Sequence, residues 1–184
     1  MTDLHHHLLS QRGWQVGWSF EPNEASRELA KQQFGLPAAR VLSSASLDAT
    51  APKVGVILCK MVLEYLKAPW DTVRDVIRPL LTTGGLFVAT VPHADSLNRR
   101  IAGKRWIGYS PNEHNRLLTA ASARVMVLCA GLFPLRVSVG SEPFTRHDAW
   151  RPALPVKRVY KETVMRFAKA IGPGDALLMV GRLD

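Results

Sequence analysis

The chain has 184 residues, 47% of them hydrophobic, and a formal net charge of +9. A chain of this length and composition folds as one domain with a substantial core, which excludes a disordered protein. No apolar stretch approaches the roughly 20 residues of a membrane-spanning helix, and no secretory signal sequence is present. The two cysteines, Cys59 and Cys129, have no paired spacing, so we expect a reduced, cytoplasmic protein without a structural metal site.

The positive charge is concentrated in the second half of the chain. Residues 1–92 have nine Lys and Arg against eight Asp and Glu, whereas residues 93–184 have fifteen against seven. A basic half attracts anions, such as phosphorylated metabolites, acidic carrier proteins, acidic lipid headgroups or nucleic acid. The alternative interpretation is an ordinary soluble surface. No recognised nucleic-acid-binding module is visible, so a nucleic acid is not the partner we expect.

Predicted strands and helices alternate in the first half. Asn23 is a candidate N-cap for a helix that continues to about Phe34. Apolar residues at helical spacing predict a second helix from Trp70 to Leu81. Continuous runs of Val, Ile and Leu predict strands of a parallel sheet covered on both faces. We expect these strands at 14–20, 39–44, 54–59 and 86–92, with a helix end at 3–12, stopped by Gly13, and a turn at 82–85.

The second half is less regular. We expect a short helix and then a long loop within residues 93–118, a common place for a substrate lid. A helix is predicted from the cap Thr119 to Gly131. Further elements are a strand at 135–140, an amphipathic helix at 156–171 and a last strand at 175–183. The alternation of strands and helices indicates an α/β fold.

Three segments carry a family resemblance. The stretch GWQVGWSFEPNEASRELAKQQFGL resembles the second strand and helix of class I S-adenosylmethionine-dependent methyltransferases. The block around VGVILCKMVLEYLKAPW, which continues through TTGGLFVATVPHADSL, is similar to their central part. PNEHNRLLTAASARVMVLCAGLFPLRV and the ending GPGDALLMVGR resemble a subgroup of bacterial small-molecule methyltransferases.

The resemblance implies a single methyltransferase-like domain over 1–184, with 1–92 as the cofactor side and 93–184 as the substrate side. The implied fold is a Rossmann-like sheet, mostly parallel, with an antiparallel last strand and helices on both faces. The implied function is methyl transfer from S-adenosylmethionine to a small, anionic acceptor. The main alternative is a non-catalytic, methyltransferase-like partner subunit or truncated remnant. A hydride-transferring Rossmann enzyme is a more distant alternative, since no glycine fingerprint is present.

The family's first strand and glycine-rich loop precede the helix whose end lies at 3–12, so this chain is expected to lack both. The first strand lies in the middle of the family's sheet, and its absence leaves backbone groups to be paired by other means. We therefore expect self-association or a partner chain that supplies a strand. We also expect weak or absent binding of S-adenosylmethionine by the chain alone, without turnover.

Candidate cofactor residues follow the predicted strands. Glu21 stands where an acid accepts hydrogen bonds from ribose hydroxyls, or else it is a charge near a helix N-terminus. Leu47 and Asp48 occupy the family's adenine-contact position, or else form a surface turn. Cys59, Lys60 and Met61 stand where the family's backbone holds the methionine part of the cofactor. Because a cation near a sulfonium is repelled, either Lys60 points outward or the site does not serve this ligand.

The substrate side offers two candidate bases. His93 and His114 can deprotonate an acceptor near neutral pH, and His114 matches the histidine of the subgroup's "P..H" motif. The alternative for each is a loop histidine bonded to backbone. Arg105, Trp106 and Tyr109 are candidates for the acceptor pocket, or else belong to an exposed lid. Glu64 is expected to brace its loop rather than touch substrate.

Overall fold

The computed structural model describes residues 11–13, 15, 17–21, 23–34, 41–42, 52–106, 108, 110–140 and 174–184. The chain divides into two compact units, Met1–Val54 and Gly55–Asp184, which are described separately. The predicted helix at 156–171 and most of the helix at 3–12 lie outside the described residues. No helix among the described residues is long and apolar enough to cross a membrane.

The first unit contains a parallel pair of short strands and one helix. Strand β1 (Ser19–Phe20) pairs with β2 (Val41–Leu42) in parallel, with Ser19 opposite Val41. Both lie inside predicted strands. Helix α2 covers Glu24–Phe34 and begins as predicted, because the Asn23 side-chain oxygen accepts a hydrogen bond from the amide of Ser26 at 3.0 Å.

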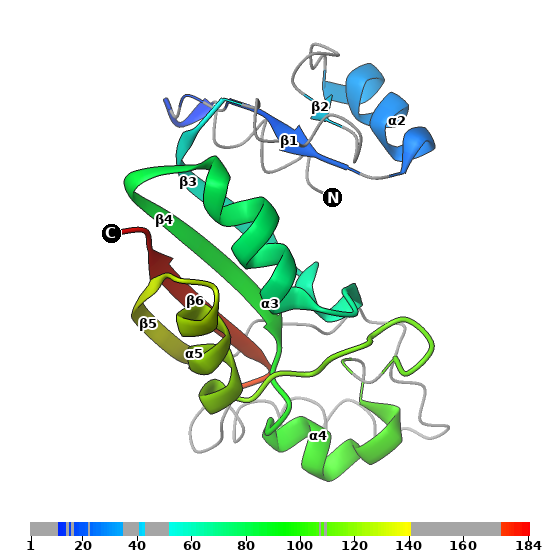
Figure 1. The fold of residues 1–184 in the computed structure, drawn as a ribbon. Helices are drawn as coiled ribbons and strands as arrows, with labels where there is room; N and C mark the ends of the chain where they lie inside the picture. Colours follow the sequence, from blue (N-terminus) through cyan, green and yellow to red (C-terminus); the bar gives the residue numbers. More distant parts are fainter. Residues whose placement is uncertain are drawn as a thin grey trace. The chain divides into compact units, whose positions relative to one another are not determined.

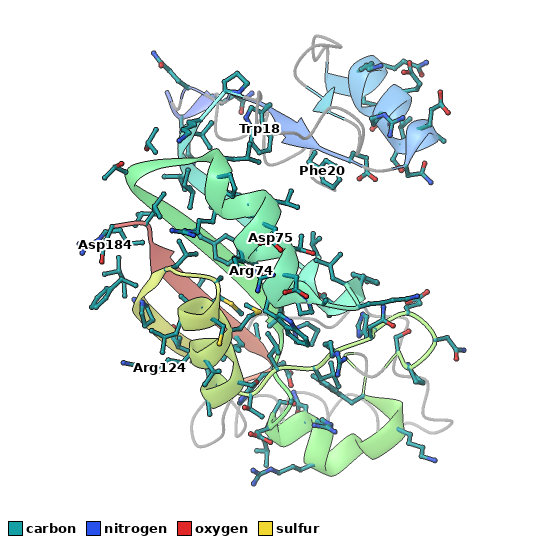
Figure 2. All side chains as sticks on the ribbon, viewed as in Figure 1. Trp18, Phe20, Arg74, Asp75, Arg124 and Asp184 are labelled. Carbon is teal, nitrogen blue, oxygen red and sulfur yellow. The ribbon has the colours of Figure 1, made fainter. Side chains whose placement is uncertain are left out.

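The entry into this unit also agrees with the sequence. Gly13 has a φ of +81°, the left-handed conformation that ends a helix. The indole nitrogen of Trp18 donates a hydrogen bond to the carbonyl of Pro52 at 3.2 Å (Figure 2). This bond ties the residue before β1 to Pro52, near the end of this unit.

The second unit is built on a four-stranded sheet with the order β3-β4-β6-β5 (Figure 1). Met61, just after β3, donates its amide to the carbonyl of Thr90 near the end of β4 at 2.8 Å. At the other end, a Cβ on Gly85 would lie 3.3 Å from the carbonyl of Gly55. The first residues of β3 thus lie beside the first residues of β4, and the last beside the last. The two strands are therefore parallel. The strands are β3 (Val54–Lys60), β4 (Leu81–Pro92), β5 (Phe133–Gly140) and β6 (Ala176–Arg182).

Strand β6 runs against its two neighbours. Val180 lies opposite Val88 in an antiparallel pair with β4, and Met179 lies opposite Val137 in an antiparallel pair with β5. Strands β4 and β5 are therefore parallel to each other, and β6 is the reversed strand. The predicted sheet, mostly parallel with an antiparallel last strand, is confirmed.

One face of this sheet forms the core. Phe87, Ala89 and Val91 on β4 lie opposite Gly181, Met179 and Leu177 on β6, and all are buried. The helical segment that begins with α3 (Pro69–Thr72) and helix α5 (Ala120–Cys129) pack together over this face (Figure 1). A side chain at position 181 would overlap Val127 of α5, so glycine allows the helix to approach the strand.

The opposite face of β3 differs from the prediction. Ile57 and Cys59 are buried, but Val56 and Leu58, which point the other way, are 37% and 51% exposed. The continuous apolar run of β3 predicted burial on both faces. Among the described residues of the second unit, α3 and α5 lie over one face of the sheet, and the alternate residues of β3 on the other face are exposed.

The helix predicted from Trp70 to Leu81 is present, but it is irregular. It passes from α3 through a π-helical turn, η4 (Val73–Ile77), into a 3-10 turn, η5 (Arg78–Leu80). Pro79 has no amide hydrogen, and its ring would clash with a carbonyl in a regular α-helix, which accounts for the changed ending. On the outer surface, Arg74 binds Asp75 and Asp71 at 2.7 Å each (Figure 2).

Helix α5 has the predicted boundaries. Thr119 and Ser122 form a capping box, in which each side chain accepts a hydrogen bond from the other's amide. Gly131 follows the helix with a φ of +73°. Earlier in the chain, the predicted short helix is α4 (Leu97–Ala102), followed by a 3-10 turn, η6 (Gly103–Arg105).

The TTGG segment, predicted as a turn between elements, belongs to strand β4. Strand β4 begins at Leu81, so it includes the four residues predicted as a turn. Gly84 has a φ of +75°, and hydrogen bonds connect Gly84 and Gly85 to Leu183. A Cβ on Gly85 would lie 2.7 Å from the carbonyl of Thr82, so the second glycine is required by space.

Candidate active site

The carboxyl ends of β3 and β4 lie side by side, as the bond from Met61 to Thr90 shows. In open α/β sheets, ligands bind at this edge, outside the carboxyl ends of parallel strands. Three of the predicted cofactor residues, Cys59–Met61, and the predicted base His93 are therefore brought to one edge of the sheet.

Cys59 and Lys60 occupy opposite faces of the end of β3. Cys59 is 8% exposed, and its burial, followed by the charge of Glu64, raises the pKa of its thiol to about 12. A thiol with this pKa is not a nucleophile near neutral pH. Lys60 is exposed, which agrees with the first of the two alternatives for its charge, that it points outward.

Met61 has an unusual backbone. Its φ is +52°, and it is the one non-glycine residue with positive φ among the described residues. A left-handed conformation costs an ordinary residue on the order of 1–2 kcal/mol, and such residues cluster at ligand sites. The turn changes the direction of the chain directly after β3 and leads into the 3-10 turn η3 (Leu63–Tyr65).

Glu64 lies in η3 and is buried, with 1% of its surface exposed. Its main-chain carbonyl accepts hydrogen bonds from the amides of Asn115 at 2.7 Å and Arg116 at 3.2 Å. No other described residue donates a hydrogen bond to either carboxyl oxygen. Burial raises the pKa of this carboxyl to about 7, opposed in part by its own backbone N–H. The predicted bracing of the loop is thus done by the main chain, and the side chain takes no part in it.

His93 follows β4 and is 3% exposed. Its ring nitrogen Nδ1 is 3.1 Å from the carbonyl of Gly174, and its amide donates to the carbonyl of Asp175 at 2.8 Å. A carbonyl only accepts, so Nδ1 carries the proton in this bond, and in the neutral ring Nε2 is the acceptor. His93 is therefore bonded to backbone, as the alternative interpretation held, yet in the tautomer that a base requires.

His114 has the same arrangement in a more accessible place. Its Nδ1 is 3.0 Å from the carbonyl of Gly108, which again leaves Nε2 as the acceptor. Its ring packs edge-to-face against Tyr65, with ring centroids 4.9 Å apart. An open hollow of about 270 Å³ adjoins it, lined by Ser110, Pro111, His114, Asn115 and Leu117.

The loop that carries His114 is bound to the turn after β3. Besides the two amides that reach Glu64, the Asn115 side chain donates to the carbonyl of Tyr65 at 2.6 Å, and Arg116 donates to that of Lys67. Arg116 also lies over the ring of Trp70, 5.4 Å from its centroid. The structure therefore holds the predicted substrate loop against the predicted cofactor turn.

The other predicted site residues are placed less fully. Trp106 is buried, with 4% exposed, and its indole nitrogen has no partner among the described residues. Leu47, Asp48, Tyr109 and the side chain of Arg105 lie outside the described residues. Glu21, in the first unit, accepts a hydrogen bond from the amide of Asn23 at 3.0 Å, which agrees with a role beside the helix N-terminus.

Sequence reasoning missed a polar cluster at the carboxyl end of β4. Asn98 donates a short hydrogen bond to Asp175, whose other carboxyl oxygen is buried without a partner among the described residues. Ser96, fully buried, caps α4 by accepting from the amide of Arg99. The S-x-x-R spacing signals the cap weakly, but nothing local signals a bond between residues 77 positions apart. Among the described residues, no group of His, Cys, Asp and Glu could hold a metal ion.

Comparison with known proteins identifies the fold of this chain. No protein-family model and no curated protein matches the chain. Among solved structures, a methyltransferase from Archaeoglobus fulgidus is 13% identical and superposes with a TM-score of 0.63 over 97% of this chain and 80% of its own. The chain has the fold of class I S-adenosylmethionine-dependent methyltransferases.

Two further structures widen this comparison. The methyltransferase chain of a complex with the Trm112 methyltransferase activator, from Haloferax volcanii, is 16% identical, with a TM-score of 0.67 over 98% of this chain and 79% of its own. The [4+2]-cyclase SpnF is 17% identical, with a TM-score of 0.56 over 99% of this chain and 72% of its own. The fold therefore accommodates more than one reaction, and function must be inferred from the site.

Proposed function

We propose that the chain binds S-adenosylmethionine and supports methyl transfer to a small, anionic acceptor. The observation that carries this proposal is His114, whose Nε2 is left as the acceptor beside an open hollow at the carboxyl edge of the sheet. The charge of residues 93–184 supports an anionic acceptor. The free thiols of Cys59 and Cys129 support a cytoplasmic location.

The described residues fit the cofactor at two places. In the first unit, Glu21 directly follows β1 and has a carboxylate suited to ribose hydroxyls. In the second unit, considered by itself, the backbone of Cys59–Met61 turns sharply at the carboxyl end of β3. Bound S-adenosylmethionine would supply a methyl group activated by its sulfonium, and S-adenosylhomocysteine would be the leaving group. Leu47 and Asp48 remain proposed adenine contacts, and Arg105, Trp106 and Tyr109 remain proposed acceptor contacts.

In this proposal His114 acts on the acceptor. With the cofactor bound, Nε2 of His114 would take the proton that the acceptor oxygen or nitrogen gives up on methylation. The bond from Nδ1 to Gly108 holds the ring in the basic tautomer, and the edge of Tyr65 fixes its plane. His93 is the second candidate base, at a more buried position.

A methyl-transfer assay tests the base. Radiolabelled S-adenosylmethionine is offered with a panel of small phosphorylated or carboxylated alcohols and amines. Loss of a general base lowers kcat roughly 10²–10⁴-fold, so His114→Gln should lose this much while KM changes little. Asn112→Ala, an exposed change on the same loop, is the control. Equal kcat for His114→Gln and the unmodified chain would exclude the role.

Calorimetric titration with S-adenosylhomocysteine tests the ribose contact. Glu21→Ala should weaken binding by roughly 1.5–3 kcal/mol, since it removes charge-assisted hydrogen bonds. Glu24→Ala, an exposed acid in the first turn of α2, is the matched control. Identical affinities for the Glu21→Ala variant and the unmodified chain would remove Glu21 from the site.

A non-catalytic partner subunit is the second candidate function. The Haloferax volcanii structure, in which a methyltransferase is in complex with an activator protein, favours a paired state for a chain of this fold. This proposal expects self-association or a partner that supplies a strand, with weak binding of S-adenosylmethionine and no turnover. Sedimentation of the chain as a monomer together with turnover of any panel acceptor would exclude it.

A further inference from the structure

The described part of the second unit has buried polar side-chain atoms without partners, most of them on residues at the carboxyl edge of its sheet. Among the described residues these atoms are both carboxyl oxygens of Glu64, Thr90 Oγ1, Trp106 Nε1 and Asp175 Oδ1. Native structures pair nearly all such atoms, so each one requires an explanation. Three of the five are carboxyl oxygens, which accept hydrogen bonds when ionised, so the group that would satisfy them is a donor.

Among the residues with unpaired atoms, Glu64 has the side chain whose burial contributes least to the stability of the fold. Its main-chain carbonyl anchors the loop at Asn115 and Arg116, a role that any residue at this position would fill. The carboxyl contributes nothing to that anchor, and a buried carboxylate without a partner is destabilising. A buried carboxyl without a partner is a group that a ligand could satisfy.

The position of Glu64 suits a bound small molecule. Met61, three residues earlier, donates to Thr90, so the turn that carries Glu64 lies beside another unpaired oxygen. The amide of Asn115 bonds directly to Glu64, and Asn115 lines the hollow beside His114. The main chain of Glu64 is therefore the immediate neighbour of the wall of the proposed acceptor site.

The chemistry of the partner follows from charge. A buried carboxylate is stabilised most by a positive charge that also donates hydrogen bonds, and no described residue forms an ion pair with Glu64. The neighbouring Tyr65 ring adds a surface on which a cation is favourable. We propose that the Glu64 carboxylate binds an ammonium group of the acceptor, so that the acceptor is a small amine.

This inference rests on the proposed function and names its substrate class. The anionic charge proposed for the acceptor then belongs to another part of the same molecule, toward the basic residues of 93–184. Burial raises the pKa of Glu64 to about 7 without a ligand, and an ammonium partner favours the ionised form. In this proposal Glu64 recognises the ammonium group of the acceptor. The methylated atom is a different atom of the same molecule.

Ligand-observed NMR with three matched probes tests the assignment. Phenethylamine, 2-phenylethanol and phenylacetate share one ring and differ in the charge of the terminal group. At mildly alkaline pH, the chain should bind phenethylamine at least 10-fold more tightly than the alcohol. Glu64→Gln should abolish that preference, and Glu113→Gln, the same change at an exposed acid on the adjacent loop, should preserve it.

The outcomes separate the two proposals. Equal binding of phenethylamine by Glu64→Gln and the unmodified chain overturns the ammonium site. The same titrations with S-adenosylhomocysteine report on the proposed function, because its binding does not depend on the acceptor. A chain that binds phenethylamine through Glu64 but never S-adenosylhomocysteine keeps the ammonium site and overturns methyl transfer. A selective loss of S-adenosylhomocysteine binding in Glu64→Gln, with phenethylamine unaffected, would move Glu64 to the cofactor's amino group and overturn the acceptor assignment.

Discussion

The carboxyl ends of the two neighbouring strands β3 and β4 are built in different ways. After β4, the ring of His93, the hydroxyl of Ser96 and the amide of Asn98 each have a hydrogen-bond partner, and the segment is tied to the start of β6. After β3, Met61 adopts a left-handed conformation and Glu64 buries a carboxyl without a partner. Among the described residues, the end of β4 also has unpaired atoms, Thr90 Oγ1 and Asp175 Oδ1, but most of its polar groups are bonded. The turn after β3 combines a carboxyl without a partner and a left-handed backbone.

This difference separates structural from functional polar groups. Paired groups such as Asn98 hold segments together that lie far apart in the sequence. Unpaired or strained groups persist when a ligand or a reaction uses them, and replacing them commonly raises stability while lowering function. Changes after β4 should therefore destabilise the chain, whereas changes after β3 should stabilise it.

The largest effect is expected for Glu64→Gln as a function of pH. The pKa of this carboxyl rises from 4.5 to about 7 on folding, so the folded state binds the proton more tightly than the unfolded state. The resulting stability is complete below about pH 4.5 and is lost as the pH rises through about 7. Glutamine mimics the neutral carboxyl, so Glu64→Gln should be more stable than the unmodified chain by roughly 3 kcal/mol at about pH 8.

Urea unfolding at about pH 4.5 and about pH 8 measures this difference. The two proteins should have nearly equal free energies of unfolding at the lower pH. Glu113→Gln, at an exposed acid of the adjacent loop, should show no such pH-dependent gain. A Glu64→Gln variant that is less stable at the higher pH would show that the carboxylate is paired and would reverse the comparison.

The second effect is expected after β4, with the opposite sign. Asn98→Ala removes the donor to Asp175 Oδ2 and leaves this 6% exposed carboxyl without the hydrogen bond that the structure shows. Such a loss costs roughly 1–3 kcal/mol, so we expect destabilisation of about 2 kcal/mol. Thermal unfolding of Asn98→Ala beside Asn112→Ala, at an exposed loop position, measures it. A difference near zero between the two variants would mean that the cluster does not stabilise this end.

The elements of the second unit could be predicted from sequence because their signals are local. The capping box at Thr119, the stop at Gly131 and the apolar run of β3 each lie within a few residues. The antiparallel last strand came from the family resemblance, since a strand's direction has no local signal. The exposure of Val56 and Leu58 could not be foreseen, because burial depends on which helices cover the sheet.

The candidate site was less predictable from sequence, because its features also depend on which distant segments pack together. Both histidines were identified from their residue type and motif, and the structure adds their tautomers through Gly108 and Gly174. Glu64 was expected to brace its loop, and no sequence signal indicated that its carboxyl is buried without a partner among the described residues, since the lack of a partner depends on every segment around it. The left-handed backbone of Met61 had no sequence signal, because methionine does not favour that conformation.

The smallest effect concerns the backbone of Met61. At an ordinary position, glycine is less stable than alanine by roughly 0.5–1 kcal/mol because it loses more conformational freedom on folding. At a position with φ near +52°, alanine has the steric cost of a Cβ and glycine does not. Met61→Gly should therefore be more stable than Met61→Ala by about 1 kcal/mol, and comparing the two variants cancels the loss of the methionine side chain.

Val62 supplies the matched control. It is adjacent to Met61, 40% exposed, and has a φ of −128°, so Val62→Ala should be more stable than Val62→Gly by roughly 0.5–1 kcal/mol. Denaturant unfolding of the four variants should give opposite orders at the two neighbouring positions. The same order at both would mean that the turn after β3 is not strained in solution. The contrast between the two strand ends would then rest on Glu64 alone, whose carboxyl the pH experiment tests independently.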